Sequence, residues 1–263
     1  MFVLGLQGFL NHKLVFVQGL NMKSILLITL LLLCSQYAWA ANIINYSAVT
    51  DQSGIAQTSM ATPAIVTTTG NAIIVPLEES QNGNNVGSVT DTALNTYVQA
   101  TSCYESSGST YGNTDVWYAL NITGNAANIV TVHFSGGGSK YPAAYQIQVS
   151  GLAASSPFET CGLGTAASNT VTSSSFAPAN SGNLNIVSCS NNSGTMSAGT
   201  NYTFLPTGNK NAEYRLNAPA GAQTATCNNS TSNQITISAA SFKVAPSVPT
   251  IIGSSKIVNA VII

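Results

Sequence analysis

Hydrophobic and polar residues alternate with a period of two in several short stretches of the chain. At 115–121 (DVWYALN) both faces of the stretch are apolar, which predicts a buried strand with Trp117 in the core. At 145–149 (YQIQV) three apolar residues alternate with two glutamines. This second pattern predicts a half-buried strand in which Gln146 and Gln148 face solvent.

Similar runs recur along the chain and are separated by glycine, asparagine, serine and proline. The predicted strands are 62–68, 71–77, 86–90, 95–102, 115–121, 128–134, 143–149, 169–175, 183–188, 201–205, 212–217, 223–227 and 234–243. Beyond residue 40 no helical period runs free of helix-breaking residues. We therefore predict an all-β fold, a single jelly-roll-like β-sandwich of about a dozen short antiparallel strands.

An apolar segment near the N-terminus has the features of an export signal. A lysine precedes the apolar run 25–33, and Ala38 and Ala40 have the spacing of a cleavage site. We expect a signal peptide at 22–40, a start-site extension at 1–21, and no transmembrane span in the mature chain. The alternative is an uncleaved N-terminal anchor. The expected location is secreted or on the cell surface, by bacterial export.

The remaining chain divides into three predicted parts. A lead segment occupies 41–60, the sandwich domain 61–243, and a hydrophobic tail 244–263. The apolar residues within 246–263 are too few to span a bilayer. They fit a final strand, a frayed end, or a strand that pairs with the sheet edge of a neighbour, and the last option predicts self-association through 246–263.

Charged residues are scarce, at 6% of the chain, whereas serine, threonine and asparagine supply 87 of 263 residues. Beyond residue 40 there are 5 basic and 8 acidic residues, a net charge of −3. A nucleic-acid-binding protein needs a basic stripe that so few residues cannot form, so we expect no nucleic-acid partner. Neutral polar side chains are expected on the outward strand faces, where they keep the protein soluble.

Four cysteines remain once the signal peptide is removed, which suggests two disulfides with three possible connectivities. A zinc site is the rival interpretation, but it usually needs pairs two to four residues apart, and no two of these cysteines lie within 25 residues. If the strands alternate up and down, Cys103, Cys189 and Cys227 lie near one end. A long connection over 151–168 brings Cys161 there, which favours the pairs Cys103–Cys161 and Cys189–Cys227.

Several motifs together resemble an uncharacterised family of exported bacterial and phage-associated β-sandwich domains. The motifs are TPAI at 62–65, SVTD at 88–91 with NTY at 95–97, DVWYA at 115–119, SGLAASSPF at 150–158 and AASFK at 239–243. The sequence departs from the pattern at Leu94, where the family has glycine. The resemblance implies a jelly-roll-like sandwich on a cell or particle surface, and it implies no catalytic residues.

The loop 103–113 is the segment most typical of a binding site. Tyr104, Glu105, Tyr111 and Asn113 combine aromatic rings with polar groups, as sugar-binding sites on β-sandwiches do. Ordinary loop tyrosines are the competing interpretation.

Catalytic and metal-binding patterns are weak. Glu105 and Asp115 bracket one loop and are the best carboxylate pair for a glycan hydrolase, although solvated loop acids explain them as well. The adjacent Glu78 and Glu79 would point to opposite faces of a strand, and Asp91 with Asn95 offers only a partial set of calcium ligands. We therefore predict no catalytic residues, no metal and no cofactor.

These observations predict an exported, non-enzymatic β-sandwich protein that acts as a surface or extracellular binding and adhesion module. The expected partner is a glycan or another component of the cell envelope. The alternative function is a self-assembling structural subunit of a filament or surface layer, and the third is glycan hydrolysis.

Overall fold

The computed structural model describes residues 40–80, 86–107, 112–135, 138–207 and 210–246. These residues form 17 strands, every paired strand is antiparallel, and this part of the chain contains no helix. It therefore also holds no helix of the length and apolar character needed to cross a membrane. The predicted signal peptide, the start-site extension and nearly all of the tail lie outside the described residues.

Two six-stranded sheets, one small three-stranded sheet and one two-stranded sheet make up the described structure. The central sheet has the order β1 (Asn42–Thr50), β11 (Lys140–Ser150), β4 (Ala72–Ser80), β8 (Asn113–Ala119) and β6 (Val98–Gln99), and β7 (Glu105–Ser106) pairs with β8. The C-terminal sheet has the order β12 (Phe158–Thr172), β17 (Thr226–Phe242), β13 (Asn183–Asn191), β16 (Lys210–Ala218) and β15 (Thr203–Thr207), and β14 (Met196–Ser197) pairs with β17. The small sheet has the order β2 (Ser59–Ala61), β10 (Val130–Phe134) and β5 (Val86–Asp91), and β3 (Ile65–Thr67) pairs separately with β9 (Asn125–Asn128).

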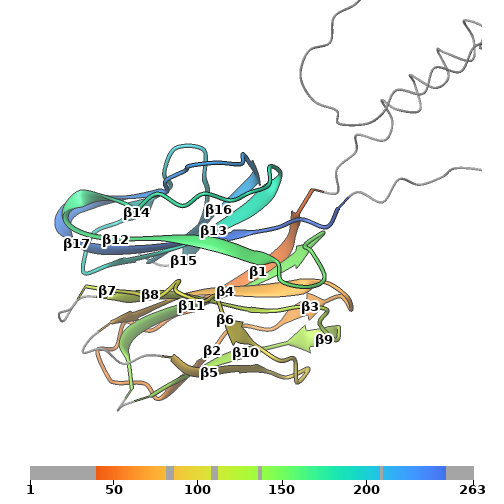
Figure 1. The fold of residues 1–263 in the computed structure, drawn as a ribbon. Helices are drawn as coiled ribbons and strands as arrows, with labels where there is room; N and C mark the ends of the chain where they lie inside the picture. Colours follow the sequence, from red (N-terminus) through yellow and green to blue (C-terminus); the bar gives the residue numbers. More distant parts are fainter. Residues whose placement is uncertain (1–39, 81–85, 108–111, 136–137, 208–209, 247–263) are drawn as a thin grey trace, which may run out of the picture. The chain divides into compact units, whose positions relative to one another are not determined.

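The central sheet is covered on both faces, as Figure 1 shows. On one face Ile74 and Ile147 pack with Ile186 and Phe242 of the C-terminal sheet. The other face carries Ile73, Val75 and Leu77, which pack with Val89, Val130 and Val132 of the small sheet. The all-β class and the sandwich packing of two main sheets are confirmed, and the small sheet adds a third layer.

The two glutamines of β11 do not face solvent, so that part of the strand prediction is wrong. Gln146 and Gln148 are both 0% exposed. The face they occupy lies beneath the chain that leads into β3, where the Thr62 hydroxyl donates to Gln146 Oε1 at 2.9 Å. Alternation with a period of two therefore identifies the strand correctly. It does not reveal that other residues pack over the polar face of this strand.

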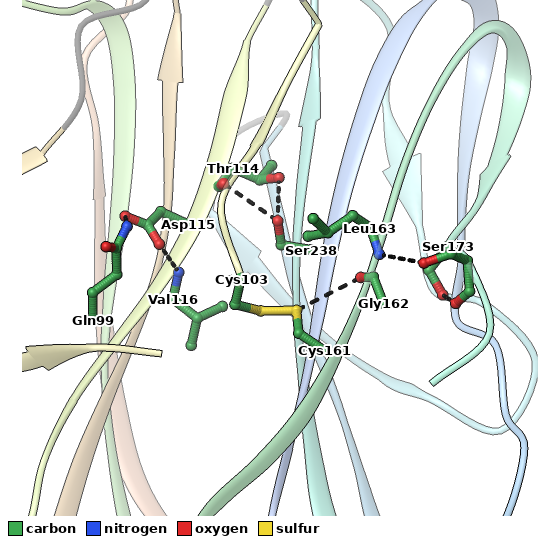
Figure 2. Close-up of a disulfide and its surroundings, with 11 residues drawn as sticks. Gln99, Cys103, Thr114, Asp115, Val116, Cys161, Gly162, Leu163, Ser173 and Ser238 are labelled. Carbon is green, nitrogen blue, oxygen red and sulfur yellow. Dashed lines mark hydrogen bonds between the residues drawn. A yellow bond between two sulfur atoms is a disulfide. The ribbon is translucent and has the colours of Figure 1, made fainter. Parts of the chain in front are cut away.

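Neutral polar side chains also fill part of the interface between the two main sheets, which corrects the expectation that they lie only on outward faces. Thr114 Oγ1 and Ser238 Oγ lie 2.8 Å apart across this interface (Figure 2). Ser188 Oγ donates to the Leu77 carbonyl at 2.6 Å. Short hydroxyl side chains can be buried in this way because each one finds a partner on the facing sheet.

The predicted long connection over 151–168 is also wrong, because β12 begins at Phe158 and pairs with β17 along 15 residues. Glycine, serine and threonine dominate this stretch and hide its strand character. A side chain on Gly162 would collide with the carbonyl oxygen of Ser174, so the close approach of the chain requires glycine there.

Both disulfides have the pairing favoured from the sequence. Cys103–Cys161 joins the central sheet to β12 of the C-terminal sheet, and its sulfurs belong to the core between the two sheets (Figure 2). Cys189–Cys227 lies on the other face of the C-terminal sheet, in a separate apolar cluster. Two such bonds are consistent with an extracellular or otherwise oxidising location.

Leu94, where the family pattern has glycine, lies in a left-handed backbone conformation with a φ of 60°. Its side chain is 89% exposed, so packing contributes little. This conformation costs an L-residue about 1–2 kcal/mol, whereas glycine loses about 0.5–1 kcal/mol of extra chain entropy on folding. We expect Leu94→Gly to raise the free energy of unfolding by about 0.5 kcal/mol.

Urea denaturation with Leu94→Ala as the matched control checks this prediction. Alanine removes the side chain but keeps the backbone penalty, so its stability should stay close to that of the wild type. A glycine variant no more stable than the alanine variant would contradict it.

Candidate functional site

The candidate site lies at one end of β4 and β8, on the face of the central sheet that turns away from the C-terminal sheet. The register pairs Glu79 with Asn113 and Leu77 with Asp115. Because directly paired residues of antiparallel strands share a face, Glu79, Asn113 and Asp115 point to the same side. Trp117 follows two residues later on that side, opposite Gln99 of β6.

Asp115 is the centre of the hydrogen bonds at this site. Gln99 Nε2 and Trp117 Nε1 each donate to Asp115 Oδ2 at 2.7 Å, and the Val116 N–H donates to Oδ1 at 2.8 Å. Figure 2 shows Gln99 and Asp115 side by side. Burial raises the pKa of Asp115 to about 7, although these three donors oppose the shift. The carboxylate thus holds one exposed amide and one half-buried indole in fixed positions.

Glu79 supplies a second buried carboxyl group at this end of the sheet. Its Oε1 accepts from the Val86 N–H at 2.9 Å, and its Oε2 has no hydrogen-bond partner within the described residues. Burial, with a further contribution from the charge of Asp115, raises the pKa of Glu79 to about 8. The side chain is therefore largely protonated at neutral pH.

Tyr104 lies within electrostatic range of these carboxyl groups. It is partly buried, and burial raises the pKa of its hydroxyl, with smaller contributions from the charges of Glu79, Asp115 and Glu105. Gln99 and Trp117 thus meet at Asp115, and Tyr104 is a second partly buried aromatic side chain within electrostatic range of that carboxyl group.

The structure separates the residues predicted from the loop. Tyr104 and Asn113 join the site, but Asn113 is buried. Glu105 pairs with Thr114, so it lies on the opposite face from Asp115, and the proposed hydrolase pair does not face one cleft. Tyr111 lies outside the described residues.

Gln99, Trp117 and Glu79 are site residues that the sequence interpretation missed. The apolar strand around Trp117 favoured a core position, and the side chain does pack against the apolar cluster between the central and small sheets, although part of it stays exposed. Gln99 reaches Asp115 through the pairing of β6 with β8, a contact across 16 residues that alternation within one strand does not show.

Other candidate sites prove to be structural. Asp91 accepts hydrogen bonds from the backbone and side chain of Asn95, from the Tyr97 hydroxyl and from the Asn128 amide, at 2.7–3.1 Å. Its oxygens therefore close a turn instead of facing a cation. Glu78 and Glu79 point to opposite faces as expected, since Glu78 accepts from Ser190 of the C-terminal sheet at 2.9 Å.

A small open hollow lies at the far end of the central sheet, lined by Gly70, Asn121, Leu152 and their neighbours. Its free volume of about 10 Å³ holds one water molecule at most, so it is too small for a sugar ring.

The fold is that of an all-β sandwich protein with two disulfides, and the candidate site lies at one end of its central sheet. The chain matches no protein-family model, no curated protein and no solved structure. No family is therefore identified for it.

Proposed function

We propose that this protein is an exported, non-enzymatic β-sandwich module that binds a neutral glycan of a cell surface or extracellular matrix. The site is the surface formed by Gln99, Tyr104 and Trp117 over Asp115. The observation that carries the proposal is the arrangement in which Asp115 holds the Gln99 amide and the Trp117 indole, with Tyr104 within electrostatic range of the same carboxyl group.

Sugar recognition needs the two kinds of group that this surface offers. Aromatic side chains pack against the apolar face of a pyranose ring, and amides exchange hydrogen bonds with its hydroxyls. The ionisable groups placed at the site are acids, which offer no positive charge to an anionic glycan, and this supports a neutral ligand.

The burial of the carboxyl groups supports binding instead of catalysis. Glu79 and Asp115 are at most 1% exposed, so neither is placed to exchange protons with a bound sugar. Their observed contacts are with the chain itself, which suits a structural role beneath the surface.

Binding to a panel of neutral polysaccharides, measured by affinity electrophoresis of the full chain, tests this proposal. We expect at least one polysaccharide to retard the protein, and we expect Gln99→Ala and Tyr104→Ala each to weaken binding by about tenfold, the loss of one good contact. Tyr46→Ala is the matched control, because Tyr46 is an exposed tyrosine on β1, at the opposite edge of the same sheet. Absence of binding to every polysaccharide, or an equal loss in the control, would overturn the proposal.

A further inference from the structure

Three potential metal ligands converge on the outer face of the C-terminal sheet. They are Cys189 of β13, Cys227 of β17 and Glu213 of β16, and their sulfur and carboxylate atoms all lie within 4.8 Å of one another. All three residues are 0% exposed. The two cysteines are 38 residues apart in the chain, so this convergence depends on the fold and not on a short sequence motif.

Glu213 is not satisfied by the surroundings that the structure shows. Its Oε2 accepts from the Gly199 N–H at 2.8 Å, but its Oε1 is buried with no hydrogen-bond partner among the described residues. A buried carboxyl group with a vacant oxygen beside two sulfurs costs stability unless a cation or a proton neutralises it.

We propose that reduction of the Cys189–Cys227 disulfide creates a binding site for one thiophilic divalent cation of the Zn²⁺ class, with Cys189, Cys227 and Glu213 as its protein ligands. Zinc binds thiolate sulfur at about 2.3 Å and carboxylate oxygen at about 2.0–2.2 Å in tetrahedral geometry. Ligand atoms around one ion are then roughly 3.3–3.8 Å apart, so the two sulfurs, which are bonded to each other in the oxidised chain, must separate to that distance on reduction, whereas the Glu213 carboxylate already lies within 4.8 Å of both. A water molecule completes the coordination.

The disulfide and the metal exclude each other. A dithiol reductant transfers two electrons and two protons to the disulfide, which yields two cysteine thiols, and the dithiol becomes a disulfide. The cation then displaces the two thiol protons and the proton of Glu213, so binding releases up to three protons. The bound site carries one net negative charge, because two thiolates and one carboxylate surround a divalent ion.

Titration of the reduced full chain with Cd²⁺ tests the proposal, because thiolate-to-cadmium charge transfer absorbs in the ultraviolet. The chain is reduced with a dithiol, freed of it by anaerobic gel filtration, and compared with the oxidised chain. We expect the reduced chain to bind one tight equivalent and the oxidised chain to bind none. A reduced chain without a tight equivalent would overturn the proposal.

The variant Glu213→Gln separates this site from simple binding by free thiols. Even groups outside the first coordination sphere commonly change metal affinity by about 10–100-fold, so loss of the carboxylate ligand should weaken binding by about tenfold or more. Glu159→Gln on β12 is the matched control and should bind as the wild type does. The pair C189S/C227S reports what the remaining thiols of Cys34, Cys103 and Cys161 bind alone. Equal affinity of Glu213→Gln and the wild type would overturn the assignment.

Discussion

The folded protein should lose stability as the pH rises from 5 to 9. Three buried carboxyl groups cause this: burial raises the pKa of Glu79 and of Glu213 from 4.5 to about 8, and that of Asp115 from 3.8 to about 7. In each case the neutral acid fits the interior better than the anion does.

The direction of this pH dependence follows from the number of protons that the folded and the unfolded chain bind. Between about pH 4 and pH 8 the folded chain keeps protons on these groups that the unfolded chain has released, so the free energy of unfolding falls with rising pH. Below that window both states are protonated and the groups cost nothing. Above that window both states are ionised, and the folded state is destabilised by the full cost of burying the charged carboxylates.

Chemical denaturation of the disulfide-bonded protein at pH 5, 7 and 9 measures the effect. The midpoint should be highest at pH 5, and Glu213→Gln should flatten the slope because a neutral amide stands in for one of the titrating groups. Glu159→Gln is the control, since Glu159 is partly exposed and accepts from the Asn183 amide. A midpoint that rises from pH 5 to pH 9 would contradict the burial of these three groups as acids.

Removal of the Cys103–Cys161 disulfide should cost about 4 kcal/mol, the loop-entropy value for a separation of 58 residues. This bond ties the segment between β6 and β7 to β12, and so links the two main sheets. The variant C103A/C161A is suitable because both sulfurs lie against the apolar core, where a serine hydroxyl would be unsatisfied.

Urea denaturation of C103A/C161A, carried out without a reductant, measures this loss of stability. The pair C189A/C227A is the comparison, with a separation of 38 residues and a bond within the outer face of one sheet. We expect the cross-sheet variant to lose at least as much stability as this comparison. A loss of under 1 kcal/mol would show that the sheets hold together without the bond.

The local pattern of apolar and polar residues was sufficient to predict several of the strands. The apolar patterns of 71–77, 115–121 and 143–149 predict three strands, and the structure places them side by side in the central sheet as β4, β8 and β11. Gln146 shows the limit, because a polar residue under a third layer looks the same in sequence as one in water. The part of β12 over 158–168 was missed because its glycine-rich composition is typical of a connection, whereas the predicted strand 169–175 overlaps its last residues.

The candidate site was only partly predictable, since its contacts join distant parts of the chain. Tyr104 was identified from its loop, but its proximity to Glu79 depends on the pairing of β4 with β8. The convergence of Glu213 with two distant cysteines likewise depends on three strands of one sheet. Sequence spacing alone favoured a disulfide and gave no reason to consider the glutamate.

Fluorescence of Trp117 during titration with neutral oligosaccharides tests the proposed glycan site most directly. The chain has 2 tryptophans, Trp39 and Trp117, so Trp39→Phe leaves the indole that donates to Asp115 as the single reporter. A saturable change in emission that Tyr104→Ala weakens about tenfold, and Tyr46→Ala leaves unchanged, is the predicted result. Emission that stays constant with every oligosaccharide that the protein binds would show that the glycan lies elsewhere.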